Sequence, residues 1–228
     1  MKNSPQDLIL HQLKTRAFLK QKVFDITQFA FGELKEVLSM MPEIFNPALE
    51  GSDERLKLEF FDLGQFVVRL KLAGDVLVFN MHTNAFQFDR DHKVWELPYV
   101  KENGARTYCG VINIFNFLND SFRYNRMDDL GYLVARIFIN GEGHFFVEGK
   151  RQRSMGLSGF GTSVMNREAW LRIIETAMLY SLEFDLLVPP YDNMKIISLA
   201  QMNEEIMQSK MRTGKRLGFV FNSDDVNQ

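Results

Sequence analysis

The chain has one cysteine, Cys109, among its 228 residues, and this scarcity excludes two kinds of structural scaffold. A single thiol cannot build a disulfide framework, and it cannot supply the several thiolates of a structural zinc site. With 6 Pro and 15 Gly, the chain is neither collagen-like nor of low complexity. No apolar run approaches the roughly 20 residues needed to span a bilayer, and the first apolar run is too short for a signal peptide. We therefore expect no membrane segment and a cytoplasmic protein.

The chain also has little net charge. Its formal charge is −2, and residues 1–114 and 115–228 carry −1 each. No basic arm or acidic tail is present to recruit nucleic acid over the whole molecule. Because 46% of the residues are apolar, the composition is that of a folded globular protein and excludes intrinsic disorder.

Residues 1–46 have the pattern of a helical segment. Ser4 followed by Asp7 is a helix-start signature, and apolar residues then recur at spacings of three and four. We expect Pro42 and Pro47 to end the segment. The pattern fits one long bent helix or two shorter helices equally well. The predicted buried stripe comprises Phe31, Leu34, Leu38 and Met41.

Residues 55–149 change to the alternation and composition of β-strands. The strands are separated by short turns, so they must be antiparallel. The clearest hairpin covers residues 132–148, where Asn140-Gly141 has the residues of a tight two-residue turn. A further strand is expected over Val94–Val100.

Residues 163–213 are again helical in pattern. Ser163 or Asn166 can cap a helix that runs to about residue 182, and a second, Met-rich helix begins near Asn193. The tail 222–228 should fray. The predicted fold class is α+β: a single domain, 1–228, in which N-terminal and C-terminal helices flank a central antiparallel sheet of about six to eight strands. The stripe of the first helix comprises Trp170, Ile173, Ile174, Ala177 and Met178.

The segment 150–163 is the most suggestive of a binding site. It places cations, glycines and hydroxyls just before a predicted helix, and glycine allows backbone N–H groups to converge on an anion. It lacks the motif of a phosphate-binding P-loop and that of a serine hydrolase. An exposed loop with solvated cations explains the same pattern. The candidate anion-binding residues are Lys150, Arg151, Arg153, Ser158, Gly159, Gly161, Thr162 and Ser163.

A second basic cluster lies near the end of the last predicted helix and contains Lys210, Arg212, Lys215 and Arg216. Cations in a last helical turn complement the helix dipole, which is the simpler explanation. If the two clusters shared a face they could bind RNA or DNA, although the net charge of −2 argues against this.

Two other groups of polar residues have the composition of candidate sites. The turn Asp89–His92 and His82 match no known metal-ligand spacing, so no metal and no cofactor are expected. The segment 122–129 mixes aromatic, Arg and Asp residues between two strands, as binding loops do, but it would also suit a self-paired surface turn.

These patterns favour a binding or regulatory protein over an enzyme, because no catalytic constellation emerges. The expected ligand is a small anion or a protein partner, and the Met-rich C-terminal helix suggests a homodimer. Two alternatives stay open. One is an enzyme acting on a phosphorylated or carboxylated substrate held by the 150–163 loop, and the other is a nucleic-acid-associated protein.

Overall fold

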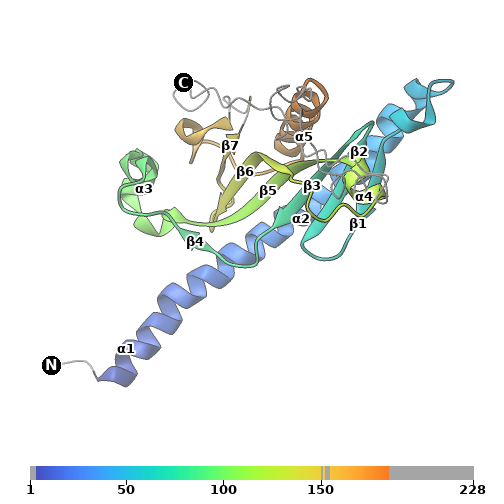
Figure 1. Cartoon of the computed structure of the whole chain (residues 1–228). Helices are drawn as coiled ribbons and strands as arrows, with labels where there is room; N and C mark the ends of the chain where they lie inside the picture. The colour runs from blue at the N-terminus through green and yellow to red at the C-terminus, as the bar shows by residue number, and fades with distance from the viewer. Residues whose placement is uncertain (1–3, 150, 152–154, 185–228) are drawn as a thin grey trace, which may run out of the picture.

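The computed structural model describes residues 4–149, 151 and 155–184. Its first part is one continuous helix, made of α1 (Pro5–Gln12), a π-helical turn (Leu13–Ala17) and α2 (Phe18–Phe45). Of the two arrangements that the sequence allowed, the single long helix is therefore present (Figure 1). The predicted start is confirmed, because Ser4 and Asp7 form a reciprocal capping box.

Pro42 does not end this helix, and that prediction is wrong. The helix continues through Pro42 to Phe45, and a 3₁₀ turn, Asn46–Leu49, follows. A proline this close to a helix end removes only one late backbone hydrogen bond. The side chain of Asn46 then fixes the exit of the chain, because its Oδ1 accepts from the Leu58 N–H at 2.8 Å and its Nδ2 donates to the Leu58 carbonyl at 3.0 Å.

The middle of the chain forms one antiparallel sheet of seven strands, as the alternation predicted. The strand order is β1-β2-β3-β5-β6-β7, and the short β4 pairs with the start of β5. Neighbours in sequence are thus neighbours in space almost throughout, which short connections favour. The strands are β1 (Glu59–Asp62), β2 (Val67–Leu72), β3 (Asp75–Met81), β4 (Phe86–Gln87), β5 (Tyr108–Leu118), β6 (Tyr132–Asn140) and β7 (Phe145–Gly149).

The hairpin of β6 and β7 is confirmed, but its turn is not the predicted two-residue turn. Four residues, 141–144, connect the strands, and the left-handed backbone falls at Gly143 (φ 80°). The Asn140 side chain accounts for this, since its Oδ1 accepts from the N–H groups of Glu142 and His144. The asparagine thus caps a wider turn from its first position.

The strand predicted over Val94–Val100 is absent. A 3₁₀ turn, Lys93–Glu96, and the short helix α3 (Pro98–Glu102) occupy this segment. Pro98 lacks a backbone N–H and suits the first turn of a helix, whereas it would interrupt a strand ladder. A second 3₁₀ turn, Gly104–Thr107, leads into β5.

The main core lies between the helices and one face of the sheet, which we call the inner face. The predicted stripe of α2 is buried, and α5 (Arg167–Leu182) packs beside α2. Asn166 caps α5 by accepting from the Ala169 N–H at 2.9 Å. Of the two predicted caps, Ser163 and Asn166, the second is therefore confirmed. All five residues predicted for the buried stripe of α5 are buried, and Trp170 is among the largest fully enclosed side chains.

The opposite, outer face of the sheet is covered at one end by a second, smaller core. Cys109 and Val111 of β5 point into it, together with Phe138 of β6 and Phe146 of β7. The segment 93–107 and Phe160 close over these side chains. Cys109 is a fully buried free thiol on a strand, as expected. Figure 1 shows α3 at this end of the sheet and α4 (Asn119–Arg123) at the other.

We predict that Gly110→Ala lowers the free energy of unfolding by roughly 2 kcal/mol. A Cβ at Gly110 of β5 would overlap with the Thr27 side chain of α2, which is buried and already donates to the Val23 carbonyl. Gly32→Ala is the matched control, because a Cβ there meets nothing within 4 Å, and it should raise the free energy of unfolding by about 0.5–1 kcal/mol. Urea unfolding followed by circular dichroism measures both, and equal effects would contradict the close packing of α2 on β5.

Candidate functional site

The predicted anion loop is described only in part, and its one described cation is neutralised. The Arg151 guanidinium forms an ion pair with the Glu183 carboxylate just after α5, and it lies 5.8 Å from the centre of the Tyr180 ring. Lys150 and Arg153 lie outside the described residues. So does the whole second basic cluster: Lys210, Arg212, Lys215 and Arg216.

The glycine and hydroxyl part of the loop closes on itself. The N–H of Gly159 donates to the Gly156 carbonyl, and the N–H and hydroxyl of Thr162 both donate to the Gly159 carbonyl. Ser158 is exposed, and the Ser163 carbonyl is 3.0 Å from Nδ1 of His144. These groups form successive tight turns, so the N–H groups of Gly159 and Thr162 are committed to the loop. Anion binding by this loop stays a prediction.

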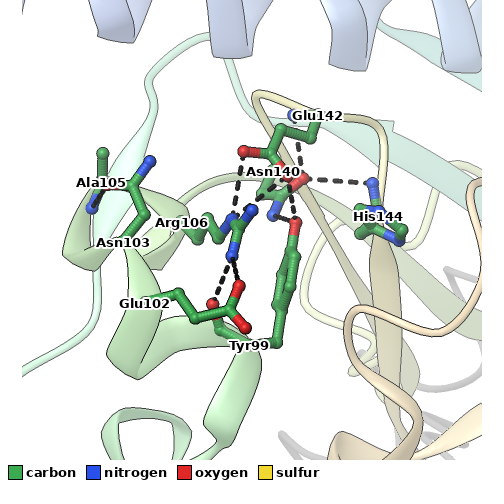
Figure 2. Close-up of polar contacts among 8 residues, drawn as sticks. All are labelled: Tyr99, Glu102, Asn103, Ala105, Arg106, Asn140, Glu142 and His144. Carbon is green, nitrogen blue, oxygen red and sulfur yellow. Dashed lines mark hydrogen bonds and ion pairs between the residues drawn. The ribbon is translucent and has the colours of Figure 1, made fainter.

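Gly161 brings the loop against a polar network that sequence reasoning missed (Figure 2). Its φ is +93°, and a Cβ there would overlap with the Tyr99 ring. The Tyr99 hydroxyl donates to Glu142 Oε2 at 2.8 Å and accepts from Asn140 Nδ2 at 2.9 Å. Tyr99 belongs to α3, Asn140 is the last residue of β6, and Glu142 belongs to the β6–β7 turn. The network therefore ties the α3 segment to that turn.

Arg106 completes the network as a doubly paired cation. It contacts Glu142 through Nε at 3.1 Å and Glu102 through Nη1 at 2.8 Å, and Nη1 also donates to the Tyr99 carbonyl. Its guanidinium lies 4.1 Å from the centre of the Tyr99 ring. The Tyr99 hydroxyl, the Glu142 carboxylate and the Arg106 guanidinium each have partners within the network (Figure 2), which is the arrangement of a structural clamp.

The pKa values in the network agree with a clamp. Burial is the largest influence that raises the pKa of Tyr99 to about 12, so its hydroxyl is a donor at neutral pH. Burial alone would raise the pKa of Glu142, but hydrogen bonds from Tyr99 and Arg106 and the charge of Arg106 outweigh it and hold that pKa below its ordinary 4.5. A neutral phenol therefore donates to a charged carboxylate.

A different arrangement exists at the opposite end of the sheet, around α4. Its aromatic–arginine surface consists of Phe61 of β1, Arg69 of β2, Phe122 and Arg123 of α4, and Tyr124. The two phenylalanines are each 39% exposed and Tyr124 is 37% exposed. Arg123 lies 5.4 Å from the centre of the Tyr124 ring. The surface therefore combines solvent-accessible rings with cations.

Arg69 is the central group of this surface. Its guanidinium lies 5.4 Å from the centre of the Phe61 ring and 4.6 Å from that of Phe122, so two aromatic side chains hold it. Its Nε is buried and has no hydrogen-bond partner, and among the described residues no carboxylate forms an ion pair with it. A guanidinium with a desolvated nitrogen and no counter-charge is the unusual feature here.

Two cations that line the adjoining hollow differ from Arg69, because each has an acidic partner, whereas Arg123 forms no ion pair among the described residues. Lys71 pairs with Glu59, and Arg55 pairs with Asp53 at 2.5 Å. An open hollow of about 810 Å³ lies beside the surface. Its lining includes Phe61, Arg123 and Tyr124 of the surface, Arg55 and Lys71, and the acids Asp53, Glu59 and Asp120.

The segment 122–129 combines the two features that its sequence suggested, a self-paired turn and a mixture of aromatic and Arg side chains. Its acidic end is self-paired, because Asp129 Oδ2 accepts from the Ser121 hydroxyl at 2.7 Å and lies 3.8 Å from Arg126 Nη1. Its aromatic end belongs to the aromatic–arginine surface. Sequence reasoning found this segment but missed Phe61 and Arg69, which lie directly opposite each other on β1 and β2. Alternation alone could have placed these two on one face, but not beside Phe122.

The turn Asp89–His92 shows no metal-binding arrangement. His92 stacks on Phe88 with ring centres 4.5 Å apart, and its Nδ1 accepts from the Val94 N–H. His82 packs against Phe86 instead. In the part of the chain that the structure describes, no group of three or more His, Cys, Asp or Glu side chains could hold a metal ion. Nor does any helix among these residues have the length and apolarity to cross a membrane.

Comparison with known proteins adds no relative. No protein-family model, no curated protein and no solved structure matches the chain.

We predict that Glu142→Gln lowers the free energy of unfolding by about 1 kcal/mol at pH 7, because it removes the charge that Tyr99 and Arg106 contact. Since the folded-state pKa of Glu142 is depressed, its contribution is complete above 4.5 and disappears as the pH falls through the lower folded value. The difference between wild type and variant should thus narrow on acidification. Urea unfolding at several pH values measures it, with exposed Glu96→Gln as the control; a difference independent of pH would contradict the clamp.

Proposed function

We propose that this protein is a binding module that holds a partner polypeptide at the aromatic–arginine surface, with an acidic side chain of the partner placed against Arg69. The observation that carries this proposal is the set of contacts that the Arg69 guanidinium makes. This guanidinium lies near the rings of Phe61 and Phe122, and no carboxylate among the described residues forms an ion pair with it.

The composition of the surface supports a protein partner. Aromatic residues and Arg are enriched at the energetic centres of protein interfaces, where they combine large contact area with directed hydrogen bonds. Phe61, Phe122 and Tyr124 each keep more than a third of their surface exposed, so an incoming chain has apolar area to cover. Stacking already restricts the Arg69 side chain, so binding costs little additional conformational entropy.

The charges around the surface favour one carboxylate over a polyanion. An acidic side chain would supply the counter-charge that the described residues do not give Arg69, and a guanidinium can contact a carboxylate with two parallel hydrogen bonds. The hollow beside the surface is lined by Asp53, Glu59 and Asp120. These three acids would repel the repeated phosphates of RNA or DNA. An acidic and apolar peptide segment fits both the rings and the local charge.

The test is selection of binding peptides from a random phage-displayed library on the immobilised full-length protein. The selected peptides should carry Asp or Glu next to aromatic or aliphatic residues. A synthetic peptide of the selected sequence should bind Arg69→Met at least about tenfold more weakly than wild type, because the variant keeps apolar bulk but loses the charge.

Arg136→Met is the matched control, since Arg136 is an exposed arginine of β6 that already pairs with Glu148 at 2.6 Å. It should leave peptide affinity unchanged. Thermal unfolding of both variants establishes that they are folded. Selected peptides without acidic residues, or equal losses of affinity in the two variants, would refute the proposal.

A further inference from the structure

A hollow of about 520 Å³ lies where the π-helical turn of the long helix passes β4 and the start of β5 (Figure 1). We call it the β4 hollow. Arg16 of the π-helical turn and Arg90, shortly after β4, both line it, whereas no Asp or Glu of the described residues does. Its volume is within the range of roughly 300–1,000 Å³ that small-molecule sites span. The β4 hollow is therefore a cationic site of small-molecule size.

Both arginines of the β4 hollow pack on aromatic rings. The Arg90 guanidinium lies 4.0 Å from the centre of the Trp95 ring, and the Arg16 guanidinium lies 5.9 Å from the centre of the Tyr108 ring. Within the described part of the chain, neither arginine forms an ion pair with a carboxylate. A guanidinium that packs on a ring keeps N–H groups in its own plane that can donate hydrogen bonds. Two cations are thus positioned to bind an anion.

The acids that flank Arg90 in the sequence face a different hollow. Asp89 and Asp91 line the one beside His92, together with Glu148. Of the turn Asp89–His92, Arg90 alone lines the β4 hollow. The charge that this turn presents to the β4 hollow is therefore positive.

Tyr108 adds a buried hydroxyl to the β4 hollow. Tyr108 is only 7% exposed, and its hydroxyl makes no hydrogen bond to any described residue. It lies directly opposite Gln87 in the pairing of β4 with β5, and both residues line the hollow. A phenol enclosed to this degree usually has a hydrogen-bond partner. An acceptor bound in the hollow would supply one.

The backbone of the long helix is irregular at the same place. The Phe18 N–H donates to the Leu13 carbonyl five residues earlier, and the Thr15 hydroxyl donates to the His11 carbonyl at 2.7 Å. Single π-helical turns of this kind occur frequently at functional sites. This turn carries Arg16, so the irregular backbone coincides with one cationic wall of the β4 hollow.

We propose that the β4 hollow binds the monoester phosphate of a small molecule whose remaining part is apolar or aromatic. A phosphate monoester carries a charge of about −1.5 to −2 at pH 7, which matches two guanidiniums, whereas a single carboxylate would leave one of them without a counter-charge. The Tyr108 hydroxyl donates to the same phosphate. Leu19, Trp95 and Ala105 line the hollow as well and contact the apolar part of the ligand.

This site is separate from the other surfaces considered above. The aromatic–arginine surface lies around α4, and the β4 hollow lies at the end of the sheet that the segment 93–107 covers, so either proposal can fail alone. It also differs from the 150–163 loop, where the sequence predicted an anion. The Met-rich C-terminal helix, on which the predicted homodimer depends, lies outside the described residues, so the homodimer stays a prediction.

The first test is an NMR titration of the isotope-labelled full-length protein with phenyl phosphate. The chain has two tryptophans: Trp95 lines the hollow, and Trp170 is fully buried in the main core. The indole N–H signal of Trp95, assigned with Trp95→Phe, should shift and saturate at millimolar phenyl phosphate, while that of Trp170 stays in place. Inorganic phosphate should bind more weakly because it lacks the ring, and benzoate because it has one charge. No saturable shift at Trp95, or tighter binding of benzoate, would overturn the proposal.

The second test assigns the binding to the two arginines. Arg16→Met and Arg90→Met should each raise the dissociation constant of phenyl phosphate at least about tenfold, because each removes one guanidinium. Lys14→Met is the matched control, since Lys14 is an exposed cation of the same π-helical turn but does not line the hollow, and it should leave the affinity unchanged. Tyr108→Phe keeps the ring and should weaken binding about threefold or more.

Thermal unfolding establishes that these variants are folded. Equal losses of affinity in Lys14→Met and Arg16→Met would refute the site, because they would show attraction by the overall charge of the helix. A short single-stranded DNA that binds more tightly than phenyl phosphate, and loses affinity in Arg16→Met, would also refute the proposal, because a polymer would then replace the small molecule.

Discussion

The packing of α2 across the inner face of the sheet is the interaction on which the rest of the structure depends. α2 crosses the central strands closely enough that Gly110 of β5 has no room for a side chain beside Thr27. Around that contact Phe31, Leu34 and Leu38 are fully buried, and each large side chain removed from water stabilises the fold by about 1.5–3 kcal/mol. α5 adds Trp170 on the same face. Because α2 and α5 both pack on the inner face, neither helix covers the outer face.

The arginines at the two ends of the outer face differ in their partners. At the α3 end, Arg106 contacts two carboxylates and stacks on a ring that is itself hydrogen-bonded, so the network is complete. At the α4 end, Arg69 lies near two rings, but no carboxylate among the described residues pairs with it. Ring contacts and ion pairs thus occur together at the α3 end, whereas at the α4 end the described residues give Arg69 the ring contacts alone. That difference separates a structural clamp from a surface that we propose binds a partner.

The long helix extends beyond the sheet at its N-terminal end (Figure 1). Where it lies on the strands, its apolar residues form the core. In α1 and at the start of the π-helical turn the same backbone carries Leu8, Ile9 and Leu13, but no strand covers them. A helix can extend in this way because its backbone hydrogen bonds are satisfied within itself. The apolar side chains of this part of the helix are therefore exposed among the described residues.

The sequence by itself determined the features that depend on neighbours along the chain. The cap at Ser4, the cap at Asn166, the buried stripes of the helices and the antiparallel sheet all follow from local spacing, and all are present. The local pattern predicted the wrong turn at Asn140, because the side chain of this residue caps a wider turn. Only the tertiary structure decided the position of Arg69, because Phe61 and Phe122 reach it from separate elements. Contacts between distant segments depend on strand order and loop paths, which no short-range periodicity encodes.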